Sequence, residues 1–246
     1  MDLDSPELTL VRLQIIRSKP FLKAIYDEWY EMLNNSLPGM EGHVLELGSG
    51  AGFLKDVIPN VITSEVFFSP NVDLIADGCR LPIPESSLRA IVMTDVLHHI
   101  PAVELFFHEA VRCLRPGGRI LMIEPWVTSW SKLIYQNLHH EPFLPDSKDW
   151  GFPSSGPLSG ANGAIPWILF VRDRKKFEQM YPQLTIESVH PFMPFRYLLS
   201  GGVSTRNLIP GMSAQWIKKF ESLFDANHWG MFAFVSLRLN KDVGPR

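Results

Sequence analysis

Apolar residues along this chain follow two repeating patterns. Over 21–33 and again over 103–114 they recur at the helical spacing, which predicts two amphipathic helices. Short runs rich in apolar residues predict buried strands at 43–47, 61–65, 72–77, 89–95 and 120–125. Because strands alternate with helical segments, the pattern favours an α/β fold with a parallel sheet and helices on both faces.

The second half of the chain is less regular. Its spacing predicts helices at 126–138, at 172–181 and after Ser213, and strands at 184–190 and 231–238. Between 139 and 163, prolines, glycines, serines and aspartates interrupt any periodicity. A loop of that length inside a compact domain is usually functional or mobile.

A glycine-rich turn follows the first predicted strand, and we expect a helix after it. Gly48, Gly50 and Gly52 let the backbone turn sharply and let a ligand approach without meeting a Cβ atom. The N-terminus of the expected helix would direct free N–H groups towards that ligand. Phe53 stands where the dinucleotide fingerprint needs a small residue, which argues against a nicotinamide-dependent oxidoreductase.

Four blocks of sequence resemble the class I methyltransferases that use S-adenosylmethionine, in particular the type 11 domains. The first is the acidic-x-Gly-x-Gly-x-Gly run that begins at Glu46. The others are Asp77-Gly78 with Leu-Pro-Ile-Pro after it, Asp95 with Leu-His-His after it, and Leu-Arg-Pro-Gly-Gly-Arg-Ile-Leu at 114–121. They stand in the family's order and together cover about residues 40–125. The resemblance implies S-adenosylmethionine as cofactor and methyl transfer as activity.

The same resemblance implies a Rossmann-like, doubly wound sheet of seven mostly parallel strands with the last one antiparallel. It implies that the turn wraps the methionine part of the cofactor and that Glu46 works near its amino group. It also implies that Asp77 hydrogen-bonds the adenine amine and that the strand end at Asp95 lines the cofactor. Of the two adjacent histidines, one would face the methyl donor and the other would lie in the core. The implied cofactor-binding residues are therefore Glu46, Gly48, Ser49, Gly50, Gly52, Asp77, Gly78, Asp95 and His98.

Glu65 is a further candidate for the cofactor site. It lies 19 residues after Glu46, close to the spacing at which an acidic group meets ribose hydroxyls. A carboxylate can accept two hydrogen bonds from a vicinal diol. The register of the strand leaves Ser64 as the alternative, and a solvated strand-end glutamate remains the simpler interpretation.

Candidate catalytic groups are few, because a sulfonium donor is already activated and the protein mainly has to position the reactants and exclude water. If the acceptor must lose a proton early, a general base is needed. His99, His139 or its neighbour His140, and Glu124 are the candidates, each with a structural role as its alternative. We predict no metal ligands, since Asp95 and His99 should lie on a strand end and turn and not on one helix face.

Composition limits the remaining choices. With 46% hydrophobic residues and a net charge of −3, the chain has no basic excess for a nucleic-acid partner. The acidic N-terminus and the lack of a long apolar run predict neither a signal peptide nor a transmembrane segment. Cys79 and Cys113 are too few for a disulfide scaffold, which fits a cytoplasmic protein.

We expect one domain over 1–246, with an N-terminal helical flap at 1–40, a cofactor-binding half at 41–125 and an acceptor-side half with insertions at 126–246. The aromatic content of the second half suggests a small or lipid-like methyl acceptor. A non-catalytic S-adenosylmethionine-binding module is the alternative. Neither the acceptor nor the oligomeric state follows from the sequence.

Overall fold

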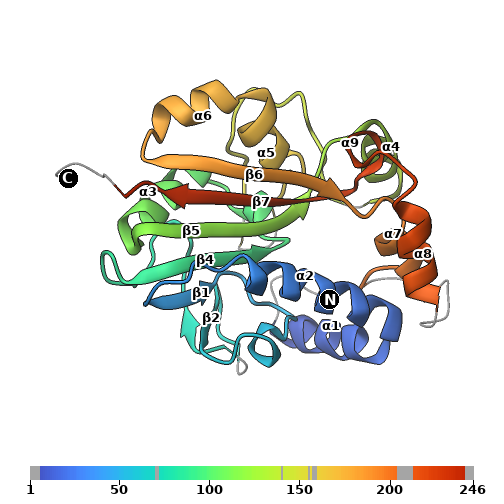
Figure 1. Ribbon diagram of the computed structural model, residues 1–246, viewed down its shortest axis with the longest axis horizontal. Coiled ribbons are helices and arrows are strands. Elements are labelled where there is room, and N and C mark those ends of the chain that lie inside the picture. Colours follow the sequence, from blue (N-terminus) through green and yellow to red (C-terminus); the bar gives the residue numbers. More distant parts are fainter. Residues whose placement is uncertain are drawn as a thin grey trace.

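A seven-stranded sheet organises the fold (Figure 1). The computed structural model describes residues 6–69, 72–139, 141–154, 156, 160–203 and 213–241. Within them the strand order is β3-β2-β1-β4-β5-β7-β6. The strands are β1 (His43–Glu46), β2 (Val61–Glu65), β3 (Leu74–Ile75), β4 (Leu88–Thr94), β5 (Leu114–Pro125), β6 (Leu184–Phe192) and β7 (Phe232–Leu239). β7 pairs antiparallel with both β5 and β6, and the other pairs are parallel. The predicted fold is confirmed.

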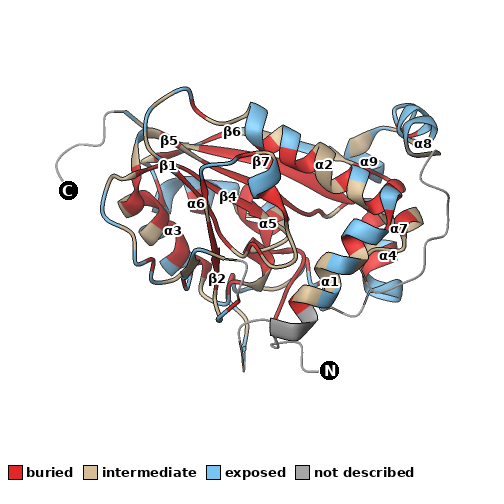
Figure 2. Cartoon of the chain, turned by 90° about the horizontal axis from the view of Figure 1, so that it is seen from below, coloured by how far each residue is buried: buried red, intermediate tan, exposed pale blue. Residues whose placement is uncertain are grey.

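Central strands are buried on both faces, as their continuous apolar sequence requires. In β4 and β5, residues 90–93 and 120–123 are all fully buried. β6 lies at the edge, and its first four residues alternate between buried and exposed. Figure 2 shows the strands buried in the interior and helix α8 (Ala214–Glu221) exposed to solvent.

Two of the predicted helices pack through aromatic side chains. α2 (Pro20–Asn35) places Trp29 against Phe232 of β7, with ring centroids 4.9 Å apart. α3 (Val103–Cys113) places Phe107 against Phe177 of α6 (Arg174–Met180), also at 4.9 Å. Their apolar faces therefore bury the large side chains that the helical spacing singled out.

The remaining helices surround these layers. α1 (Pro6–Ser18) precedes α2 and lies in the segment that we expected to be a helical flap, although no spacing marked it as a separate helix. α4 (Ser129–Leu138) begins with a capping box in which the Thr128 hydroxyl accepts from the Ser131 N–H at 3.0 Å. α5 (Ile165–Trp167) continues into the π-helical turn η3 (Ile168–Arg172). α7 (Arg196–Ser200), α8 and α9 (Ala226–Trp229) fill the long connection from β6 to β7.

The prediction of an α-helix directly after the glycine turn is wrong. Only one 3₁₀ turn, η1 (Leu54–Asp56), follows it, because β2 already begins at Val61 and leaves residues 53–60 for the whole connection. Phe53 packs edge-on against Tyr30 of α2, with centroids 5.0 Å apart. The turn therefore offers its own backbone to a ligand and lacks the long helix dipole that we expected.

The described residues of the 139–163 loop form no helix or strand. Among all described residues, we find no helix that combines the length and the apolar character needed to cross a membrane.

Candidate functional site

A cavity of about 1170 Å³ opens beyond the carboxyl ends of β1, β2 and β4. In such sheets this is where ligands bind. The N-terminal helices contribute Tyr26 and Tyr30 to its wall. Of the predicted site residues, those that line the cavity are Glu46, Gly48, Ser49, Gly50, Gly52, Glu65, Asp77, Gly78, Asp95, His99 and His139.

The glycine turn adopts a backbone that side chains would disturb. Gly48 and Gly50 have φ of +66° and +46°, in the left-handed region that favours glycine. A Cβ atom on Gly48 would lie 2.7 Å from Cγ2 of Val96, and one on Gly52 would lie 2.6 Å from the Tyr30 hydroxyl. The turn therefore needs glycine at position 50 for its backbone conformation, at position 52 for space, and at position 48 for both.

Glu46 lies at the floor of the turn with an unused acceptor. Its side chain is buried, and among the described residues Oε2 has no hydrogen-bond partner. Burial raises the pKa of Glu46 to about 7, a hydrogen bond from Ser49 lowers it, and the charge of Glu65 adds to the rise. A buried, unpaired carboxylate oxygen is costly unless a ligand supplies a donor, and an ammonium group would do so.

Glu65, and not Ser64, faces the cavity. Oε2 of Glu65 accepts from the Gly50 N–H at 2.9 Å, and Oε1 accepts from the N–H of Val66 at 3.0 Å. Ser64 is fully buried, and its hydroxyl donates to the Glu46 carbonyl at 2.8 Å. Burial raises the pKa of Glu65, while the two backbone hydrogen bonds lower it. Of the two residues, only Glu65 lines the cavity among those described, and its contact with ribose stays a prediction.

Asp77 and Asp95 occupy different environments at the same cavity. Asp77 is exposed and accepts from the Cys79 N–H at 2.8 Å. Asp95 has φ of +64°, uncommon for a residue with a side chain and frequent at functional sites. Burial raises the pKa of Asp95 to about 7, against the lowering effect of His98.

Among the described residues, the structure does not place His98 or Glu124 on the cavity wall. Nδ1 of His98 lies 2.7 Å from Oε2 of Glu124. Oε1 of Glu124 accepts the backbone N–H groups of Val96 and Leu97 at 2.9 and 2.7 Å. Glu124 is fully buried with both oxygens engaged, so it holds the turn after β4 and has no path to an acceptor.

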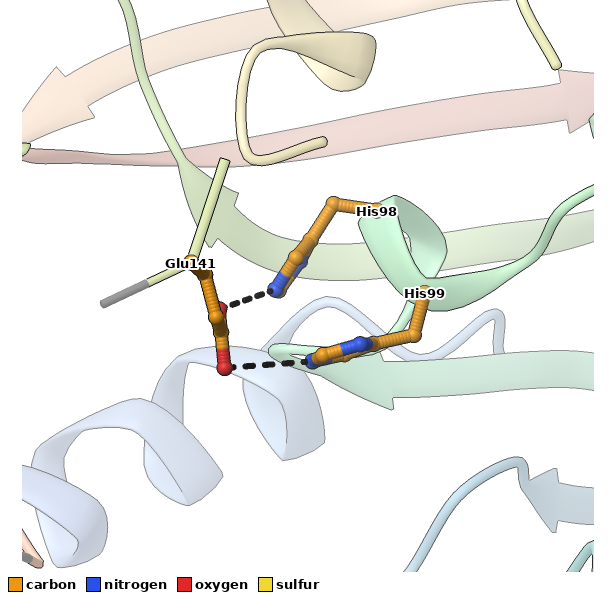
Figure 3. Close-up of side chains that lie close together, drawn as sticks. All are labelled: His98, His99 and Glu141. Atoms are coloured by element: carbon orange, nitrogen blue, oxygen red, sulfur yellow. Dashed lines mark ion pairs between the residues drawn. The ribbon is translucent and has the colours of Figure 1, made fainter. Parts of the chain in front are cut away.

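Glu141, which we did not predict, joins the two adjacent histidines (Figure 3). Its carboxylate oxygens lie 3.6 Å from Nε2 of His98 and 3.8 Å from Nε2 of His99. Burial lowers the pKa of His98, but hydrogen bonds to Glu124 and Glu141 outweigh this effect and hold it well above its ordinary value. Burial, then the charge of His98, lowers the pKa of His99 to about 4. Glu141 lies in an irregular loop, where no local pattern marks it.

Comparison with known proteins shows which family the cofactor-binding half resembles. Residues 45–122 match the family described as methyltransferase domain. Over these residues the chain is similar to the class I S-adenosylmethionine-dependent methyltransferases. The matched part holds the glycine turn, Glu65, Asp77 and Asp95. Its family cofactor is S-adenosylmethionine.

A relative from Mycolicibacterium smegmatis, named as a probable S-adenosylmethionine-dependent methyltransferase, is 29% identical over 110 residues. The match covers 39% of this chain and 42% of the relative, so it spans less than half of that protein.

Two solved structures share the fold over nearly the whole chain. An S-adenosylmethionine-dependent methyltransferase of Thermotoga maritima has a TM-score of 0.57 at 15% identity and covers 94% of this chain and 99% of its own. A chain from the complex of the Trm112 methyltransferase activator with a methyltransferase of Haloferax volcanii has a TM-score of 0.54 at 12% identity, covering 98% and 97%. At these identities the likeness concerns the fold alone.

The residues present fit S-adenosylmethionine. The free Oε2 of Glu46 suits the ammonium group of its methionine part, and the glycine turn leaves room for a ligand against the backbone. Glu65 and Asp77 lie on the same cavity and could hold the ribose and the adenine.

Proposed function

We propose that this protein transfers the methyl group of S-adenosylmethionine to a small or lipid-like acceptor bound in the same cavity. The observation that carries the proposal is the unpaired Glu46 oxygen beneath the glycine turn, at one side of a cavity whose other side is aromatic. A non-catalytic binding module would need the Glu46 oxygen and the glycine turn, but not the aromatic side of the cavity.

The size of the cavity supports a second ligand. Pockets for one small molecule usually measure roughly 300–1,000 Å³. At about 1170 Å³, this cavity has room for a cofactor and a modest acceptor together.

Apolar and aromatic side chains form the wall away from the glycine turn. Tyr135 stacks on Phe143 with centroids 4.7 Å apart, and both line the cavity. Tyr197 and Phe232 also line it and make edge-to-face contact at 4.8 Å, and Phe232 meets the Tyr135 ring at 6.5 Å. Such a wall favours an acceptor with an apolar or aromatic body.

Arg196 does not serve as an anchor for an anionic acceptor. Its side chain is buried, with Nη1 2.6 Å from Glu28 and Nε 2.5 Å from Glu221. Its charge is therefore already compensated by two carboxylates.

When bound, S-adenosylmethionine supplies an activated methyl group on a sulfonium. The protein's part is then to hold the donor on the glycine turn, to place the acceptor in line and to keep water out. His99 and His139 line the cavity and stay candidates for a general base, whereas Glu124 faces away from it. Asp77 and Asp95 are proposed to hold the cofactor.

Calorimetric titration with S-adenosylmethionine and S-adenosylhomocysteine tests the binding half of the proposal. We expect saturable binding that is weakened at least tenfold by Asp77→Ala and by Gly50→Val. Asp146→Ala, which removes a carboxylate that is 96% exposed, and Gly39→Val, where a Cβ meets nothing within 4 Å, are the matched controls. No binding at millimolar ligand would overturn the proposal.

A transfer assay tests the catalytic half. The protein is incubated with methyl-labelled S-adenosylmethionine and a panel of small aromatic, amine and lipid acceptors, and labelled product and S-adenosylhomocysteine are counted. Binding without turnover on any acceptor would favour the non-catalytic module.

We further propose a cytoplasmic setting. It is supported by Cys79 and Cys113, which are both free thiols. Cell fractionation with an antibody against the protein tests this.

A further inference from the structure

His98, His99 and Glu141 converge at one point beside the cavity. One ligand-type atom from each, an imidazole nitrogen or a carboxylate oxygen, lies within 4.8 Å of the other two. Figure 3 shows the Glu141 carboxylate facing both imidazole rings, with His98 and His99 approaching from the turn after β4. Glu141 comes from a different segment, the loop after α4, so that the fold has to bring the three together.

Both imidazole rings are held by their other nitrogen. Nδ1 of His98 lies 2.7 Å from Glu124, and Nδ1 of His99 lies 3.2 Å from the carbonyl oxygen of Gly160. Oxygen acceptors at Nδ1 keep a proton there, so Nε2 of each ring is the nitrogen left for an ion. At His98 the ion would displace the Nε2 proton that faces Glu141. Metal-bound histidines are oriented in this way, by a carboxylate or a backbone carbonyl on the far nitrogen.

The distances are those of a metal site before it closes. Atoms bound to one metal at about 2.0–2.2 Å lie roughly 3–3.5 Å apart. The two separations from Glu141 are 3.6 and 3.8 Å. Because the three ligand atoms lie within 4.8 Å of one another, small movements of both imidazole rings and of the Glu141 side chain would bring all three groups onto one ion.

The donor set limits the choice of ion. Two imidazole nitrogens and one carboxylate suit zinc, iron, cobalt or manganese in the divalent state. Magnesium and calcium prefer oxygen ligands throughout. Three protein ligands also leave at least one coordination position for water or another small ligand.

That open position would face the cavity. His99 and Glu141 both line it, whereas His98 lies behind them and is buried. An ion at this point would therefore be reached from the same space that we propose for the methyl acceptor.

We propose that Nε2 of His98, Nε2 of His99 and the carboxylate of Glu141 bind a divalent first-row transition metal of the zinc type at the cavity wall. Glu124 positions His98 from behind, and the Gly160 carbonyl positions His99. Metal binding can be tested separately from the proposed methyl transfer, since all the ligands are present without a cofactor.

Titration of the chelator-treated full-length protein with Co²⁺ tests this site. We expect one equivalent to bind, with the visible absorption band of cobalt in a site containing nitrogen ligands, and Zn²⁺ to displace it. His99→Gln and Glu141→Gln are each expected to weaken the affinity at least tenfold, since even outer-shell changes cost 10–100-fold. Both positions are partly exposed, and circular dichroism checks that the variants fold.

His228→Gln and Glu178→Gln are the controls. Their side chains are 72% and 44% exposed and form ion pairs far along the chain from the cluster. We expect both variants to bind Co²⁺ like the unmodified protein.

Three outcomes would overturn the proposal. The first is no saturable binding at millimolar Co²⁺ or Zn²⁺, which would leave His98 as an imidazolium with Nδ1 towards Glu124 and Nε2 towards Glu141. The second is unchanged affinity in both cluster variants. The third is a loss in His139→Gln that exceeds the loss in His99→Gln, which would move the ion to His139, whose Nδ1 lies 4.0 Å from Glu141. Because no cofactor is present in these titrations, failure here says nothing about methyl transfer.

Discussion

Oε2 of Glu65 accepts a hydrogen bond from the backbone N–H of Gly50 at 2.9 Å. The bond joins the end of β2 to the middle of the glycine turn, so one side chain both shapes the turn and faces the cavity. This relationship lets the conformational role of Glu65 be separated from its role in binding.

We expect Glu65→Ala to weaken S-adenosylmethionine binding at least tenfold, because it removes the proposed ribose acceptor and frees the turn. The free energy of unfolding should fall by about 1–3 kcal/mol, the usual net value of two hydrogen bonds, because the N–H groups of Gly50 and Val66 both lose their acceptor. Glu65→Gln keeps an acceptor for Gly50 and should lie between the two proteins in affinity. Calorimetry and urea denaturation measure both quantities. Equal affinity in all three proteins would rule out a binding role.

Gly48→Ala and Gly50→Ala should differ in cost, although both residues have positive φ. At Gly50 the nearest atom to a new Cβ is 3.7 Å away, so only backbone strain of about 1–2 kcal/mol applies. At Gly48 the Cβ would also overlap Val96 at 2.7 Å, which should cost at least about 1 kcal/mol more. Denaturant unfolding measures the difference, with Gly39→Ala as control. A larger loss at Gly50 would contradict the turn geometry.

Much of the cofactor side was predictable, because its features are local. The left-handed backbone at Gly48 and Gly50 follows from residues that tolerate it, and the buried strand before the turn follows from its own apolar run. The order of the blocks from Glu46 to Asp95 then places their carboxylates at one edge of a parallel sheet.

Features that depend on distant partners could not be predicted. Glu141 has meaning only through His98 and His99, more than 40 residues earlier, and the loop that carries it has no periodicity. The inward turn of Glu124 depends on the unpaired N–H groups of Val96 and Leu97, which no pattern in β5 reveals. The helix that we expected after Gly52 was wrong for a different reason. The few residues before β2 begins are too short a segment for it, and only a 3₁₀ turn forms there.

Arg196 forms a buried ion pair that should be far more valuable than its exposed counterparts. It joins Glu221 of α8 to Glu28 of α2. We expect Arg196→Met to lower the free energy of unfolding by about 3–5 kcal/mol, because the buried Glu221 loses its cation and Glu28 is left with Lys218 at 3.2 Å. The control is Arg174→Met, whose ion pair with Glu178 is about half exposed, and it should cost less than about 1 kcal/mol. Thermal or urea unfolding measures both. If both variants lost the same free energy of unfolding, the buried ion pair would stabilise the fold no more than the exposed one.

Glu46 should give the cofactor site a pH dependence of its own. Because burial raises its pKa to about 7, the carboxylate that would meet the ammonium group is lost as pH falls through 7. We expect the affinity for S-adenosylhomocysteine to fall between pH 8 and pH 6. Methylthioadenosine, which lacks the amino-acid part, should show no such change at this residue. Calorimetry with the two ligands at both pH values makes the comparison, and parallel pH profiles would contradict the assignment.

The stability of the unliganded protein should change in the opposite sense. A carboxyl group with a raised pKa in the folded state stabilises the fold below its unfolded pKa of about 4.5, and this contribution is lost as pH rises through about 7. Glu46→Gln removes that loss, so relative to the unmodified protein the variant should gain roughly 3 kcal/mol between pH 4.5 and pH 8. It should also bind S-adenosylhomocysteine at least tenfold more weakly at pH 8. Urea unfolding at the two pH values, with the exposed Glu178→Gln as control, tests this. If Glu46→Gln gained no relative stability at pH 8, the ionised Glu46 carboxylate would not destabilise the unliganded fold, and the argument from its burial would be wrong.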